Sequence, residues 1–149
     1  MGHRPVIEAK MLSVEEVMHY WPGIERDLKL NPEAWHLWYT LDHLQHMAVS
    51  GAAQVWVAGT PRQWRLMVWT QLAIYSTGPV LQLMLAIGQN IKELMPTVEA
   101  TLEKFAQSRN CTRVEVIAYR VGWEKLLEGF GFKKLSFILS RPVSGTRMN

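Results

Sequence analysis

Residues Thr112–Arg141 constrain the fold of this chain more than any other stretch. The alternation of apolar and polar residues predicts a strand that ends at Tyr119. A short helix is predicted after Gly122, followed by a Gly-Phe-Gly-Phe turn and a second strand from about Lys133. A strand–helix–strand unit of this kind is typical of α/β domains, in which the helix packs on a sheet.

The first third of the chain predicts one short strand and two helices. Val6–Met11 is the candidate strand, and Ser13 opens a helix because Glu16 lies three residues further on, which is the capping-box spacing. Pro22 is expected to break or bend this helix. A second helix is predicted over Asn31–Val49, because asparagine followed by proline is a typical helix start.

The middle of the chain predicts an antiparallel meander followed by a helix. The helix is expected to hold Pro96 in its first turn and to end near Ser108. Together with Thr112–Arg141, these elements predict one domain over residues 1–143 and a loose tail over 144–149. The three meander strands are predicted at Gln54–Gly59, Trp64–Ile74 and Val80–Ile87.

The composition excludes several kinds of protein. The 149 residues carry a formal net charge of +3, and their basic side chains are scattered, so nucleic-acid binding is not expected. No apolar run is long enough to span a membrane, and no secretory signal is recognisable, which predicts a cytoplasmic protein. His43 and His46 lack further ligands nearby, so no metal site is expected. Cys111 is the only cysteine and is interpreted as a packing residue.

The order of the predicted elements resembles the GNAT-type N-acetyltransferase fold. Leu126–Phe132, which reads LLEGFGF, is similar to the late helix and closing Gly-Phe turn of that family, with Phe132 expected to fill the junction before the last strand. The resemblance implies an α/β (α+β) fold. Its central sheet is expected to be mixed but mostly antiparallel, with helices on both faces.

The resemblance also implies a loop for acetyl-CoA, and here the sequence departs from the family. Family members hold the pyrophosphate with a loop resembling Arg/Gln-x-x-Gly-x-Gly/Ala, whose glycines let backbone amides approach the phosphates. The matching positions, Asn90–Met95, contain no glycine, and Gly88 comes too early to replace one. Ile91, Leu94 and Met95 are expected to place bulk where the phosphates would lie.

A second departure concerns the general acid. Many family members carry a tyrosine in the late helix that protonates the departing coenzyme thiolate. The matching residue is Leu127, which has no proton to donate. Arg120 takes the place of an asparagine that often precedes this helix, and Tyr119 is near in sequence but lies on the preceding predicted strand.

These departures favour a non-catalytic GNAT-like protein that works through protein contacts and needs no cofactor. Seven tryptophans in 149 residues support a protein partner, and a homo-oligomer is compatible with the fold. Arg120–Trp123 also resembles a pattern in small GNAT-like proteins of tailed bacteriophages, some of which are associated with virion assembly. That resemblance implies a phage protein found in the host cytoplasm or in the virion.

Two alternatives stay open. The first is an active N-acyltransferase that uses acetyl-CoA through an altered loop, with Glu115 or Tyr119 as base or acid. Its candidate cofactor-binding residues are Ile87, Gly88, Gln89, Asn90 and Lys92. The second is a module that binds nucleic acid or a small ligand, which would require a basic face to form from Arg62, Arg65, Arg109, Arg113 and Arg120.

Overall fold

The computed structural model describes residues 6–60, 63–116, 123–135 and 140–143. The chain divides into two compact units, Met1–Tyr119 and Arg120–Asn149, and each is described by itself. The predicted single domain over 1–143 therefore stays a prediction, and the predicted tail at 144–149 lies outside the described residues. The elements of the first unit are β1 (Glu8–Met11), α1 (Val14–Leu30), the 3-10 helix η1 (Pro32–Ala34), α2 (Leu41–Ser50), β2 (Ala53–Thr60), β3 (Gln63–Tyr75), β4 (Gly78–Gly88), α3 (Ile91–Ser108) and β5 (Arg113–Val116).

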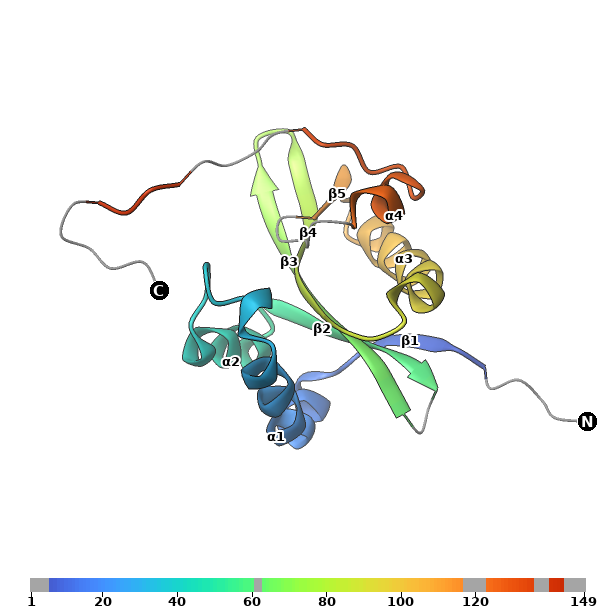
Figure 1. Ribbon diagram of the computed structural model, residues 1–149. Helices are drawn as coiled ribbons and strands as arrows, with labels where there is room; N and C mark the ends of the chain where they lie inside the picture. Colours follow the sequence, from blue (N-terminus) through green and yellow to red (C-terminus); the bar gives the residue numbers. More distant parts are fainter. Residues whose placement is uncertain (1–5, 61–62, 117–122, 136–139, 144–149) are drawn as a thin grey trace, which may run out of the picture. The chain divides into compact units, whose positions relative to one another are not determined.

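One mixed sheet organises the first unit (Figure 1). Within the described residues its strand order is β1-β2-β3-β4-β5. The first three pairings are antiparallel and the β4–β5 pairing is parallel. The α/β fold class with a mostly antiparallel sheet is therefore confirmed.

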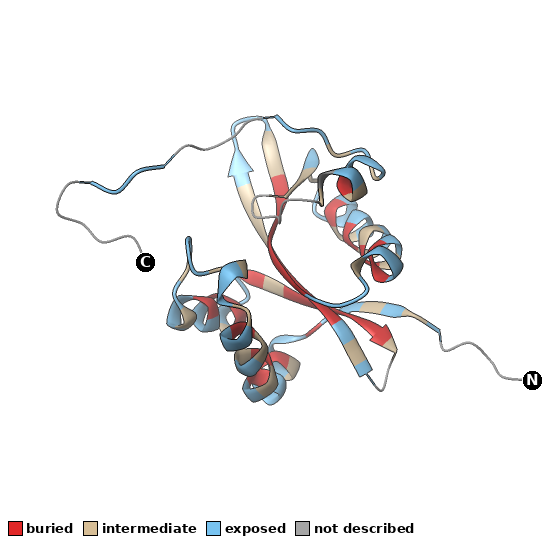
Figure 2. Ribbon diagram, in the orientation of Figure 1, coloured by how far each residue is buried: buried red, intermediate tan, exposed pale blue. Residues whose placement is uncertain are grey.

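Helices cover both faces of this sheet, as predicted (Figure 1). On one face, α1 and α2 pack their apolar stripes onto residues such as Val55 and Trp69. On the other face lies α3, where the Phe105 ring meets Trp56 edge-on at 5.3 Å between ring centroids. Buried residues run through the central part of the strands between these layers (Figure 2). Burial on both faces explains why Val80–Ile87 is apolar at every position except Gln82.

The first two helices differ from their predicted boundaries. Ser13 forms the expected capping box with Glu16, but α1 continues through Pro22 without a break. Its buried residues on either side of that proline, such as Trp21 and Ile24, hold it against the core. The predicted second helix is shorter than expected, because the chain makes only η1 after Asn31 and α2 begins at Leu41.

The second unit contains one short helix, α4 (Glu124–Glu128), where a helix was predicted. The Phe132 amide donates to the Leu127 carbonyl at 3.2 Å, which closes the predicted turn, and the Phe132 side chain is only partly buried. Residues 133–135 and 140–143 are not in a strand, so the last predicted strand is not found there. Residues 136–139 of that prediction lie outside the described residues.

Candidate functional site

The junction between β4 and α3 contains the candidate cofactor-binding residues. β4 ends at Gly88 and α3 begins at Ile91, so only two residues join them. Asn90 precedes the helix in the left-handed conformation, with φ of 58° and ψ of 40°. Its carbonyl accepts hydrogen bonds from the amides of Glu93 and Leu94 at 3.1 and 3.0 Å.

The positions that match the glycine-rich loop are helical. Ile91–Met95 forms the opening of α3, so the predicted helix start at Pro96 is wrong. Leu94 and Met95 are buried, which means that their bulk enters the core and does not fill a phosphate site as predicted. Their burial offsets the loss of the hydrogen bond that Pro96 cannot donate to the Lys92 carbonyl. A helical opening leaves no looped backbone to surround a pyrophosphate.

Gly88 is explained by packing between strands. A Cβ at this position would lie 2.2 Å from the carbonyl oxygen of Arg65 and 2.7 Å from the Cα of Leu66. The next residue, Gln89, donates its amide to the same Arg65 carbonyl at 3.1 Å. Glycine is therefore required here because β4 ends tightly against β3.

The five candidate cofactor residues divide into two groups. Ile87 is buried in the core on the α1–α2 face, and Gly88 is held against β3. Gln89, Asn90 and Lys92 are exposed around the first turn of α3. Gly88 is exposed as well, so Ile87 is the one candidate of the five that burial keeps from touching a ligand at this junction.

A β-bulge marks the middle of β4. Leu83 lies opposite Thr70 and Leu85 lies opposite Trp69, so Met84 is the extra residue. Within the described residues, the parallel pairing with β5 reaches the same point, with Leu83 opposite Val116 as the last pair. The residues of β4 that follow Leu83 therefore continue past the described part of β5 (Figure 1).

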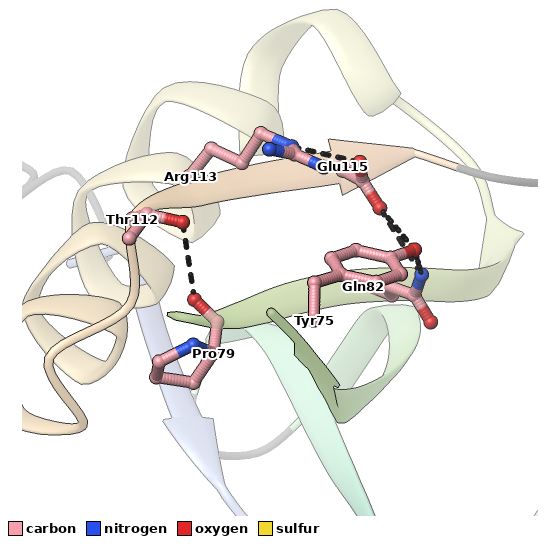
Figure 3. Close-up of polar contacts among 6 residues, drawn as sticks. All are labelled: Tyr75, Pro79, Gln82, Thr112, Arg113 and Glu115. Carbon is pink, nitrogen blue, oxygen red and sulfur yellow. Dashed lines mark hydrogen bonds and ion pairs between the residues drawn. The ribbon is translucent and has the colours of Figure 1, made fainter. Parts of the chain in front are cut away.

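A polar network lies above the bulge, at the end of the sheet where β3, β4 and β5 run side by side (Figure 3). Gln82 Nε2 donates to the Tyr75 hydroxyl at 2.8 Å and to Glu115 Oε1 at 3.1 Å. The Tyr75 hydroxyl donates to Glu115 Oε1 at 3.2 Å, and Arg113 Nε donates to Glu115 Oε2 at 2.8 Å. Gln71 Nε2 donates to Gln82 Oε1 at 3.1 Å, so both the nitrogen and the oxygen of the Gln82 amide have partners.

The electrostatics of Glu115 follow from this network. Partial burial raises its pKa, but hydrogen bonds from Gln82, Arg113 and Tyr75 outweigh burial and hold the pKa below its ordinary value. The side chain is 22% exposed. A carboxylate with a lowered pKa and three donors is a weaker general base than a free one. The arrangement therefore favours a structural role for Glu115 over its candidate catalytic role.

The other candidate acid or base, Tyr119, lies outside the described residues, as does Arg120. The sequence did not lead us to Tyr75 and Gln82, which complete the network around Glu115. One signal was present, because Gln82 is the only polar residue in the apolar run Val80–Ile87 and is 8% exposed. A buried glutamine inside a strand needs partners on the neighbouring strands.

The described arginines do not gather into a basic face. Arg65 adjoins the Gly88 end of β4, whereas Arg113 lies opposite Val80, about eight residues or roughly 26 Å further along the strand. Arg109 lies over the Phe105 ring, and Arg62 is outside the described residues. In the part of the chain that the structure describes, no group of three histidine, cysteine or acidic side chains is arranged for a metal ion. No helix within it is long and apolar enough to cross a membrane.

Comparison with known proteins finds relatives by structure but not by sequence. No family model and no curated protein sequence matches this chain. A probable acetyltransferase superposes with a TM-score of 0.68 at 11% identity, covering 93% of this chain and 99% of that one. An aminoglycoside N-acetyltransferase in complex with CoA gives 0.67 at 9% identity, covering 97% and 99%. A predicted acetyltransferase with acetyl-CoA from Clostridium acetobutylicum gives 0.61 at 12% identity, covering 92% and 96%.

The chain therefore has the GNAT-type acetyltransferase fold. At 9–12% identity the likeness concerns the fold.

Proposed function

We propose that this chain is a GNAT-fold protein that has lost acyl transfer and works through contacts with other proteins. The observation that carries the loss of acyl transfer is the helical opening of α3. Ile91–Met95 matches the phosphate loop of the family in sequence position but forms regular helix. The Leu94 and Met95 side chains are buried in the core. Opening a loop here would expose both side chains, at a cost of about 2–3 kcal/mol for each.

Two further features support the loss of catalysis. Glu115 is held ionised by Gln82, Arg113 and Tyr75, so its lone pairs are already engaged. In α4, the residue that matches the family's acid tyrosine is Leu127, which cannot protonate a thiolate. Neither residue is suited to deprotonate an amine or to protonate coenzyme A.

Isothermal titration calorimetry with acetyl-CoA and with CoA tests this proposal. We expect no binding of either compound at concentrations up to about 1 mM, which corresponds to very weak affinity. Binding at about 1 µM would contradict it. If such binding were lost in Lys92→Ala but kept in Lys104→Ala, the cofactor would lie at the start of α3. Lys104 is a suitable control because it is an exposed lysine near the other end of the same helix.

The second candidate function is an N-acyltransferase with an altered cofactor loop. The bulge at Met84 favours it, because the extra residue of a bulge leaves backbone groups unpaired and available to a ligand. Gln89, Asn90 and Lys92 would then hold the cofactor, with Glu115 or Tyr119 as base or acid. An acetyl-donor assay over amines and peptides should show turnover that falls at least about tenfold in Glu115→Gln or Tyr119→Phe. Turnover that both variants retain would exclude these roles.

The biological setting that we propose is a tailed bacteriophage, with the protein in the infected cell or in the particle. The support is the resemblance of Arg120–Trp123 to small phage GNAT-like proteins. Mass spectrometry of purified particles should detect this chain at a constant ratio to the capsid protein. Its presence in infected cells but not in particles would restrict the proposal to the cytoplasm.

A further inference from the structure

Among the described residues of the first unit, the end of β3 forms a sheet edge with no further strand beside it. β2 begins at Ala53, opposite Gln71, whereas β3 continues to Tyr75. Among the described residues, Leu72–Tyr75 therefore pairs with β4 on one side only. Figure 1 shows the β3–β4 hairpin extending past the start of β2.

The backbone groups on this edge point away from β4. Ile74 lies opposite Pro79, which has no N–H, and the Pro79 carbonyl accepts from the Thr112 amide on the β5 side at 2.9 Å. The Ile74–Pro79 pair therefore exchanges no hydrogen bond, so the N–H and C=O of Ile74 are directed outward. The same alternation directs the N–H and C=O of Leu72 outward.

The edge lacks the features that usually prevent strands from pairing between molecules. No aspartate, glutamate, lysine or arginine occurs between Arg65 and Lys92, so the whole β3–β4 hairpin beyond Arg65 is uncharged. No proline or bulge lies in Leu72–Tyr75. The Ile74 side chain is 78% exposed. An uncharged edge with an exposed β-branched residue is a typical pairing site for another strand.

We propose that two copies of this chain pair antiparallel through the Leu72–Tyr75 edge. A two-fold axis at Ala73 places Leu72 opposite Ile74 of the partner subunit, and Ile74 opposite the partner's Leu72. Each of these pairs can exchange both of its backbone hydrogen bonds, which gives about four in total. The partner's Ala73 meets Ala73 in the closer, non-hydrogen-bonded spacing, where a small side chain fits.

The choice of a second copy as the partner follows from charge and symmetry. Self-pairing brings identical side chains together, so any charge on the edge would oppose its own kind. This edge carries none, and its hydrogen-bonding groups are complementary to themselves. The inference goes beyond the proposed function and does not depend on it, since acetyl-CoA binding at α3 would leave the β3 edge unchanged.

Sedimentation equilibrium of the full chain tests the proposal. A short edge predicts a weak dimer, so the apparent mass should rise from 17.2 kDa toward twice that value at about 100 µM. Ile74→Lys adds repulsion at the edge and should return the mass to that of the monomer. Leu30→Lys is the matched control, because Leu30 is also highly exposed, at 71%, but lies at the end of α1. This control should dimerise like the natural chain.

Ile74→Pro provides a second variant. It removes an outward N–H that makes no bond within the sheet, so it should abolish the dimer while circular dichroism stays unchanged. A natural chain that remains a monomer at about 100 µM would overturn the proposal. A dimer that persists in both Ile74 variants would overturn it as well, by locating the interface elsewhere.

Discussion

Gln82 and Glu115 are direct neighbours across the parallel β4–β5 pair, and the Gln82 amide donates to the Glu115 carboxylate at 3.1 Å. The same amide nitrogen also donates to the Tyr75 hydroxyl on β3. One buried side chain thus connects three strands whose residues are far apart in the sequence.

Replacing Gln82 by leucine should destabilise the first unit by about 1–3 kcal/mol, because Glu115 and Tyr75 each lose a partner in a partly buried place. Chemical unfolding in urea, followed by tryptophan fluorescence, measures the change. Gln107→Leu is the control, since Gln107 is exposed on α3 and should change stability by no more than about 0.5 kcal/mol. Equal effects of the two substitutions would show that the network contributes nothing measurable.

The network also predicts a pH dependence. The pKa of Glu115 is lowered in the folded chain, so its ionised form stabilises the fold above its unfolded pKa, and this contribution is lost as the pH falls through the folded pKa. Glu115→Gln should therefore lower the unfolding free energy at pH 7 by about 1 kcal/mol, after allowance for its partial exposure. The difference from the natural chain should shrink below about pH 4. A difference that does not change between the two pH values would contradict the assignment.

Glu99 on α3 predicts the opposite pH dependence. Partial burial raises its pKa, Glu103 raises it further, and its Oε2 atom is buried without a hydrogen-bond partner among the described residues. Ionised Glu99 therefore opposes folding once the pH exceeds the folded pKa, and this penalty is absent below the unfolded pKa.

Glu99→Gln should raise the unfolding free energy by about 1 kcal/mol at pH 7 and leave it nearly unchanged near pH 4. Glu103→Gln, at an exposed position one turn away, should give a smaller gain. Thermal unfolding at both pH values tests this prediction. A loss of stability in Glu99→Gln at pH 7 would show that the carboxylate has a favourable partner.

Two glycines give a matched pair of predictions about packing. A Cβ at Gly88 would lie 2.2 Å from a backbone oxygen, so Gly88→Ala should destabilise the fold by at least about 2 kcal/mol. Gly23 lies within α1 and has no atom within 4 Å of such a Cβ. Gly23→Ala should therefore stabilise the chain by about 0.5–1 kcal/mol. If Gly88→Ala were neutral in a melting experiment, the close approach of β4 to β3 would be wrong.

Local sequence signals predicted the meander well. Apolar–polar alternation and the turn residues between strands indicated Trp64–Ile74, and the strand observed is Gln63–Tyr75. The capping box at Ser13 likewise marked the start of α1. These predictions succeeded because each element is specified by residues within the element itself or directly beside it.

The candidate site could be predicted only in part. The sequence shows directly that Asn90–Met95 contains no glycine and that Leu127 takes the place of the family's tyrosine. In the structure, Ile91–Met95 begins α3 and Leu127 lies in α4. The partners of Glu115 were not visible, because Tyr75 and Gln82 are 40 and 33 residues away from it. Hydrogen bonds over such separations depend on strand order, which alternation alone does not specify.

The sequence by itself determined where the meander strands lie and where α1 begins, because alternation and capping act between residues that are close together in the chain. Only the tertiary structure decided where α3 begins and which polar groups meet. Pro96 taken alone favours a helix start, but Leu94 and Met95 continue the apolar stripe of Val98 and Leu102. Burying these two side chains against the sheet outweighs one lost hydrogen bond, so α3 begins at Ile91 and not at Pro96.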